Sequence, residues 1–208
     1  MTAPNVQSLD FQLDQLETGE LTPAATRILD TASRLFYWHG IHAVGVERIA
    51  REAGVTKKTI FDRFHSKDAL TATYLRRRDL YWRLRIRDQI ESLGALKEPK
   101  PMILAAFDAL REWVADENPR GCAFVNALAE ITDANHPGYE IIYRQKRWLS
   151  SFFETLSGQA GATHPDRVSE QLTILYEGAM VANATGGFSC TVQTAKGMAS
   201  DLLDRSLP

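Results

Sequence analysis

A short stretch of the chain carries closely spaced cationic and hydrogen-bonding side chains. If the stretch is helical, its outward side presents Lys57, Lys58, Thr59, Asp62 and Arg63. Lysine and arginine bind phosphate oxygens, and these side chains can also form hydrogen bonds with base edges in the major groove of DNA. The pattern therefore predicts a surface that reads duplex DNA.

Two small helices hinged at Gly54 would position these side chains. A glycine there can take the left-handed conformation that closes the first helix, and Thr56 can cap the second. The inward positions of both helices are apolar or small: Ile49, Ala50, Ala53, Ile60 and Phe64. This is the pattern of a helix-turn-helix, in which the small side chain of Ala50 lets the helices approach each other.

A longer helix before this pair would supply its packing surface. Thr22 followed by Pro23 is the combination expected at an N-cap and a first helical position, and Gly40 marks the expected end. Between them, apolar residues recur at helical spacing: Ile28, Ala32, Leu35 and Phe36. These form the inward stripe of an amphipathic helix.

Together with its flanks, this segment resembles the N-terminal domain of the tetracycline-repressor (TetR) family of transcriptional regulators. The resemblance runs without a gap and rests on Arg27-Ile28-Leu29, Leu35-Phe36, Gly40, Ile49-Ala50, Ala53-Gly54-Val55, Thr59-Ile60-Phe61, Phe64 and Ser66-Lys67-Asp68-Ala69-Leu70. Gly45, Lys58 and Phe61 depart from the usual threonine, glycine and tyrosine. Because Phe61 lacks the hydroxyl that touches a phosphate in relatives, we interpret it as a packing residue.

The resemblance implies a homodimer that places two recognition helices in successive major grooves of a roughly palindromic operator. It also implies a ligand-responsive regulator, a repressor that a small-molecule effector releases from DNA. The candidate base readers are Lys58, Thr59, Asp62 and Arg63, and the candidate phosphate contacts are Arg48, Thr56, Lys57, His65 and Lys67.

Charge is distributed unevenly, although the formal net charge is only -2. Residues 22–90 hold 14 basic and 7 acidic residues, residues 91–208 hold 10 and 15, and residues 1–21 hold 4 acids and no base. A basic module joined to an acidic body suggests that DNA contacts only the first half of the chain. We therefore expect a flexible acidic extension (1–21), a helix-turn-helix DNA-binding domain (22–70) and a helical effector-binding and dimerisation domain (71–208).

Apolar residues at helical spacing continue to the end of the chain, which predicts an all-α fold. The expected order is a helix over 67–93 whose arginines are solvated or ion-paired, one from 99 that ends before 118, one over 121–130, one after 138, a loop at 157–161 and two final helices. The last two resemble the helix pair that forms a four-helix dimer interface in the family.

A pocket between helices of the acidic body would suit a small-molecule effector. Its candidate lining combines aromatic side chains with a few polar groups. These residues are Trp82, Phe107, Trp113, Phe124, Asn126, Glu130, Tyr143, Lys146, Glu177 and Asn183. The alternative for each aromatic residue is an ordinary place in the core.

Three of these residues also suggest a metal site. Asn126 and Glu130 would present oxygen ligands from one helical face, and Glu177 would add a carboxylate from another helix. Oxygen ligands suit a magnesium-like divalent cation, with or without an anionic effector. The alternative is that Asn126 and Glu130 bond to the backbone or to Lys146. DNA binding itself is expected to require no cofactor.

Other protein classes fit the sequence less well. Cys122, Asp133 and His136 lie in no nucleophile motif, so we expect no enzyme. A redox-sensing DNA-binding regulator that uses Cys122 is the alternative function, although its apolar neighbours argue against a reactive thiol. No apolar run is long enough to span a membrane and no signal peptide is recognisable, so the expected location is the cytoplasm.

Overall fold

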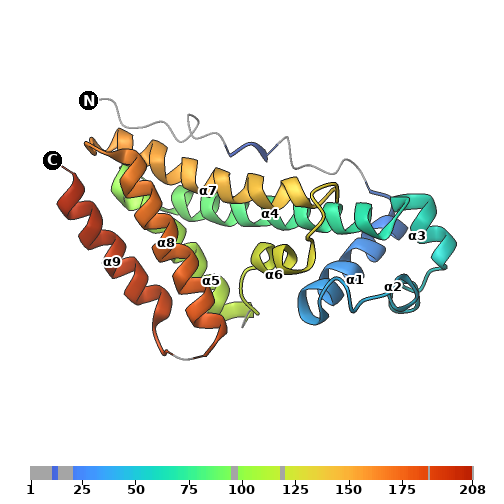
Figure 1. Cartoon of the computed structure of the whole chain (residues 1–208). Coiled ribbons are helices and arrows are strands. Elements are labelled where there is room, and N and C mark those ends of the chain that lie inside the picture. Colours follow the sequence, from blue (N-terminus) through green and yellow to red (C-terminus); the bar gives the residue numbers. More distant parts are fainter. Residues whose placement is uncertain (1–10, 14–20, 95–97, 118–119, 187, 208) are drawn as a thin grey trace. The chain divides into compact units, whose positions relative to one another are not determined.

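The computed structural model describes residues 11–13, 21–94, 98–117, 120–186 and 188–207. Over these residues the chain is helical and has no β-strand, which confirms the predicted all-α fold (Figure 1). In chain order the helices are α1 (Pro23–His39), α2 (Val46–Ala53), α3 (Lys57–Phe64), α4 (Lys67–Ser92), α5 (Pro99–Glu117), α6 (Ala123–Glu130), α7 (Tyr139–Gln159), α8 (Pro165–Ala184) and α9 (Thr191–Ser206). Within the described ranges, no helix combines the length and apolar character needed to cross a membrane.

The helices form two compact units. The first, here called the N-unit, contains residues 12–81 and 122–145. It therefore holds α1, α2, α3 and α6, together with the first part of α4 and the start of α7. The second, here called the C-unit, contains Phe11 and residues 82–121 and 146–208. Since α4 and α7 are continuous helices, each contributes residues to both units.

In the N-unit, α1 begins and ends where its local chemistry predicts. The Oγ1 atom of Thr22 accepts a hydrogen bond from the Ala25 N–H at 3.3 Å, and Pro23 opens the helix. Gly40 closes it with a φ of 90°. The core that joins α1, α2 and α3 is made by aliphatic side chains that are at most 1% exposed: Ile28, Leu35, Ile49 and Ile60.

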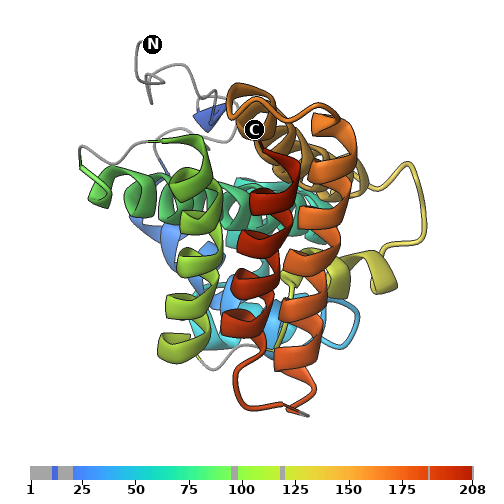
Figure 2. The same ribbon diagram turned by 90° about the vertical axis from the view of Figure 1, so that its left-hand side faces the viewer.

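In the C-unit, α9 packs against both α5 and α8 (Figure 2). The Lys196 ammonium lies 2.7 Å from the Asp108 carboxylate, which ties α9 to α5. A second ion pair between the same helices joins Lys100 to Asp204. Two ion pairs therefore join α5 and α9, in addition to the packing of their apolar faces.

Phe11, from the predicted acidic extension, has defined contacts in the C-unit. Its ring is 7% exposed and lies 6.0 Å from the ring of Trp148. The buried guanidinium of Arg83 donates a hydrogen bond to the Phe11 carbonyl oxygen at 3.0 Å and lies 4.4 Å from the Trp148 ring centroid. Residues 1–10 and 14–20 of that extension lie outside the described residues.

The segment 157–161 differs from the predicted loop. α7 continues through Ser157 and Gly158 to Gln159, and the Ala160 N–H still donates to the Leu156 carbonyl oxygen at 2.9 Å. Serine and glycine favour helices weakly, but Ser157 and Leu156 are both fully buried. Packing of this face outweighs the local preference, so the prediction of a loop before Ala160 is wrong.

Alanine at position 54 should strain the turn between α2 and α3. Gly54 has a φ of 66°, and a Cβ there would meet no atom within 4 Å. The loss therefore comes from the backbone alone, about 1–2 kcal/mol of unfolding free energy. Gly158→Ala is the matched control because its Cβ would make only an ordinary contact, 3.8 Å from Pro165. Urea unfolding at a fixed protein concentration measures both, and equal losses would contradict this account.

Candidate nucleic-acid interface

The turn between α2 and α3 has the geometry that the helix-turn-helix pattern predicts. Gly54 is left-handed, and the Val55 N–H donates to the Ala50 carbonyl oxygen at 3.0 Å. The Thr56 hydroxyl then caps α3 by accepting a hydrogen bond from the Thr59 N–H at 3.1 Å. Phe64, 6% exposed, anchors the other end of α3 in the core. One face of α3 is therefore buried, and the opposite face is held outward.

That outward face presents most of the predicted base readers. Lys58, Asp62 and Arg63 are all exposed, and the Lys58 side chain is 83% accessible. Thr59 is half-buried, and its hydroxyl lies 2.9 Å from that of Thr56. Hence the side chains of Lys58, Asp62 and Arg63 are accessible to a groove, whereas Thr59 also takes part in the helix cap.

Ion pairs order the cationic side chains in the absence of DNA. Lys58 lies 2.8 Å from Asp62 on the next turn of α3, and Lys57 lies 2.7 Å from Glu47 on α2. The hydrogen bond from Lys57 lowers the pKa of the Glu47 carboxyl. Exposed pairs of this kind contribute little to stability, so phosphate oxygens can replace the carboxylates at small energetic cost.

Arg48 on α2 belongs to a second polar network. Its Nε donates to Glu52 at 2.9 Å, and its Nη2 lies 3.0 Å from His39 Nε2. Glu52 also pairs with Arg34 of α1 at 2.7 Å. Hydrogen bonds from Arg48 and Arg34 lower the pKa of Glu52. The network holds the Arg48 side chain at the surface between α1 and α2, a suitable position for a contact with the DNA backbone.

The last two predicted phosphate contacts, His65 and Lys67, differ in accessibility. His65 is exposed and ends α3 with a φ of 65°, unusual for a residue with a side chain. Lys67 is half-buried at the start of α4. Burial lowers the Lys67 pKa, and attraction to Asp68 and Glu130 offsets this only in part. Lys67 is therefore the weaker candidate for a phosphate contact.

Phe61 is a surface residue of α3, contrary to the packing role predicted for it. Its side chain is 45% exposed, whereas the neighbouring Ile60 is 1% exposed. Successive helical positions differ by about 100° in direction, so the inward placement of Ile60 and Phe64 leaves Phe61 facing out. A phenyl ring there can contact a thymine methyl group. The helical spacing of Ile60 and Phe64 already indicated that Phe61 faces outward.

The residues predicted to bind an effector are distributed between the two units. In the C-unit, four aromatic rings pack together: those of Trp82, Trp113, Phe107 and Tyr176. The ring centroids of Trp82 and Trp113 lie 5.3 Å apart, and those of Phe107 and Tyr176 lie 5.2 Å apart. The remaining C-unit members are Lys146, Glu177 and Asn183, and the N-unit members are Phe124, Asn126, Glu130 and Tyr143. Of these, Phe124 is buried, and Asn126, Tyr143 and Asn183 are half-buried.

Both carboxylates of the predicted metal site have hydrogen-bond donors. Glu130 accepts from the N–H groups of Ile41 and His42, and Glu177 lies 2.6 Å from the Lys146 ammonium. In the described part of the chain, no three His, Cys, Asp or Glu side chains are grouped to hold a metal ion. This geometry favours the alternative of backbone and lysine partners, and the cation that would use Asn126, Glu130 and Glu177 stays a prediction.

Comparison with known proteins gives a consistent result. A family profile described as "Bacterial regulatory proteins, tetR family" matches residues 28–73. A crystal structure of a TetR-family transcriptional regulator from Streptomyces coelicolor is 30% identical, with a TM-score of 0.81 over 88% of this chain and 95% of that chain. The HTH-type transcriptional regulator YjdC of Escherichia coli (strain K12) is 24% identical over 85% of this chain and 91% of its own length. A TetR transcriptional regulator from Legionella pneumophila, 16% identical, shares the fold with a TM-score of 0.73 over 92% of this chain and 100% of that chain.

Lys58→Ala should change which DNA sequences are bound. A side chain that reads a base contributes about 1–3 kcal/mol of discrimination at one base pair, whereas a phosphate contact weakens all sequences alike. We expect Lys58→Ala to relax preference at one position of each half-site, and Lys57→Ala to weaken binding uniformly. Fluorescence anisotropy with a set of singly substituted duplexes measures both. Uniform weakening by Lys58→Ala would assign this side chain to the DNA backbone instead.

Proposed function

The chain belongs to the TetR family of DNA-binding transcriptional regulators, and on this premise we propose that it is a repressor acting as a homodimer on a roughly palindromic operator. A small-molecule effector releases it from DNA. Members of this family are transcriptional regulators and not enzymes. The observation that carries the proposal is the exposed cationic face of α3, within the segment that the family profile matches. Its place of action is the cytoplasm, where the operator lies.

An apolar groove in the C-unit supports the proposed dimer. Residues of α8, α9 and their connection line a hollow of about 620 Å³. Its side chains include Ile174, Phe188 and Met198, which are 65%, 73% and 52% exposed. Large apolar side chains gathered on one face mark interaction sites in soluble proteins. A second copy of the chain would bury this face on both protomers at once, as a two-fold interface requires.

The proposed response to an effector depends on α4. This single helix of 26 residues has its first turns in the N-unit and its last turns in the C-unit. A ligand that binds one conformation of the C-unit more tightly shifts the population of the whole protein toward it. A change in the direction of α4 would then move the two α3 helices of a dimer out of register with successive major grooves.

The alternative of redox sensing through Cys122 gains no support from the geometry. Cys122 precedes α6 and is 7% exposed. Thiol oxidation follows exposure and thiolate character, so a buried thiol is a poor sensor. DNA binding that is sensitive to diamide in the natural chain and insensitive in Cys122→Ser would revive the alternative.

The 208-residue chain should enrich a palindromic sequence from a random duplex library. We expect Arg63→Ala to reduce affinity for the enriched palindrome about tenfold or more, because arginine contacts with bases or phosphates are worth about 1–3 kcal/mol each, and two act per dimer. Arg111→Ala on α5, also exposed, is the control and should bind as the natural chain does. If no sequence is enriched, the proposed operator recognition is wrong.

Met198→Glu should separate the protomers. A carboxylate in the apolar groove would face either the same carboxylate of the second protomer or an apolar surface. Both arrangements oppose association. We expect monomers in sedimentation experiments and loss of palindrome binding with helix content retained. Leu128→Glu on α6 is the matched control for the oligomeric state in sedimentation, because Leu128 is also an exposed apolar residue, 39% accessible, outside the groove. A Met198→Glu variant that stays dimeric would exclude this face as the interface.

A further inference from the structure

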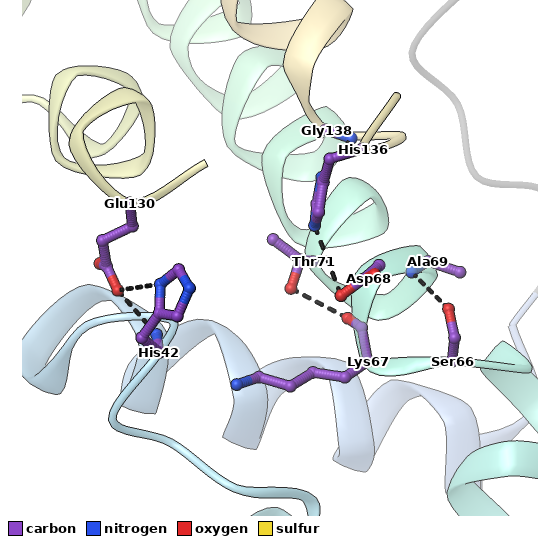
Figure 3. A network of polar contacts seen from close by, with 9 residues as sticks. All are labelled: His42, Ser66, Lys67, Asp68, Ala69, Thr71, Glu130, His136 and Gly138. Carbon is purple, nitrogen blue, oxygen red and sulfur yellow. Dashed lines mark hydrogen bonds and ion pairs between the residues drawn. The ribbon is translucent and has the colours of Figure 1, made fainter. Parts of the chain in front are cut away.

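The turn that follows α1 is held by a carboxylate from much later in the chain. After Gly40 the backbone N–H groups of Ile41 and His42 both donate to Glu130 at the end of α6. Figure 3 shows the contact with His42. The Ile41 N–H lies 3.0 Å from Oε1, and the His42 N–H lies 2.6 Å from Oε2. Successive N–H groups that converge in this way form an anion-binding concavity, and here the anion is an internal side chain.

The surroundings of Glu130 favour its ionised form. Burial opposes its charge, but hydrogen bonds from the N–H groups of His42 and Ile41 and from the His42 ring outweigh burial and leave the Glu130 pKa below its usual value. Hydrogen bonds to an ionised acceptor are about twice as strong as neutral ones. The Lys67 side chain extends toward this contact in Figure 3, and its charge is attracted to Glu130.

The chain is adapted to this contact on both sides. Gly40 has a φ of 90°, and a Cβ there would lie 3.2 Å from Glu130 Oε1. Only glycine therefore combines this backbone conformation with so close an approach of the carboxylate. On the other side, Ile131 directly after Glu130 is 4% exposed and anchors the end of α6.

A second contact joins the segment after α6 to the start of α4. His136 Nε2 lies 3.5 Å from Asp68 in the first turn of α4 (Figure 3). The Gly138 N–H donates to His136 Nδ1 at 2.9 Å, which places the ring proton on Nε2, facing Asp68. Both contacts lie within the N-unit, so α6 and the loop after it connect the α1–α2 turn with the helix that follows α3.

We propose that Glu130 is a positioning residue for DNA binding: it holds the α1–α2 turn, and thereby α2 and α3, in the orientation that presents the cationic face of α3. The proposal deepens the proposed function by naming the contact through which a displacement of α6 would reach the DNA-binding helices. Removing the carboxylate imitates such a displacement without any effector.

The sign of the effect distinguishes positioning from simple electrostatics. Glu130 is a negative charge within the unit that carries the DNA-binding helices. Removing an acidic charge from a DNA-binding unit raises affinity if only Coulombic forces act. Loss of positioning lowers affinity instead, because α3 samples orientations that fit the groove less well. The salt dependence of binding should stay unchanged, since Glu130 makes no phosphate contact of its own.

The experiment uses the whole 208-residue chain and the palindrome that the unmutated chain enriches. We expect Glu130→Ala to lower the affinity for the palindrome about tenfold. The variant loses a charge-assisted hydrogen bond to each of two backbone amides, and part of that free energy is lost from DNA binding. Glu130→Gln keeps the shape and one acceptor oxygen, and should lower affinity less. In hydrogen–deuterium exchange, peptides covering residues 40–45 should exchange at least tenfold faster in Glu130→Ala, while those of α5, α8 and α9 keep their protection.

Two controls isolate the contact. His42→Ala removes the ring but keeps the backbone N–H, and should change affinity less than twofold. Glu154→Ala removes an exposed acidic charge from α7 in the C-unit and should have no effect.

Unchanged or tighter DNA binding by both Glu130 variants, or unchanged exchange over residues 40–45, overturns the proposal. If the natural chain enriches no palindrome, the proposed function fails, whereas the exchange experiment still decides whether Glu130 holds the turn.

Discussion

A helix of eight residues is not stable by itself in water, and α2, α3 and α6 each have that length. Their structure depends on burial against longer neighbours and on bonds at their ends. For α3 the burial comes from Ile60 and Phe64, and the N-terminal bond comes from Thr56. The surface proposed to contact DNA is therefore only as rigid as the packing on its opposite side.

Carboxylates near that surface order the cationic side chains and leave them able to bind phosphate. Glu47, Glu52 and Asp62 each pair with a lysine or arginine of α2 or α3. Such exposed pairs add little to stability, because water and salt screen them. Their effect is geometric, since they restrict long flexible side chains before DNA arrives. The phosphates of a duplex, being more numerous and closely spaced, can then take over these partners.

The segment 122–145 contacts the α1–α2 turn and the start of α4 within the N-unit. It belongs to the N-unit, although it is separated in sequence from α1, α2 and α3 by α4 and α5. Glu130 and His136 make polar contacts in that association, with the backbone of the α1–α2 turn and with Asp68. If Glu130 positions α2 and α3 as proposed, a ligand that displaces α6 would act through this contact.

Local chemistry was sufficient to predict much of this protein from its sequence. Thr22, Gly40, Gly54 and Thr56 mark helix ends, and apolar spacing identifies inward faces, because caps and amphipathic stripes depend on residues a few positions apart. The all-α fold, the helix-turn-helix and its exposed cations follow from these signals. The spacing of Ile60 and Phe64 also implied an exposed Phe61, although the comparison with tyrosine suggested otherwise.

Only the tertiary structure decided which distant residues meet. The sequence left Glu130 as a candidate ligand of an effector or a metal or as a partner of the backbone, since an isolated carboxylate on a helix carries no sign of its partner. Its two donors are backbone N–H groups of Ile41 and His42, and backbone groups have no sequence signature. Burial is equally invisible in the sequence: α7 continues through the buried Ser157, where helix propensity predicted a loop. Caps and periodicity are local and can be read from the chain, whereas burial and long-range hydrogen bonds exist only after the helices have packed.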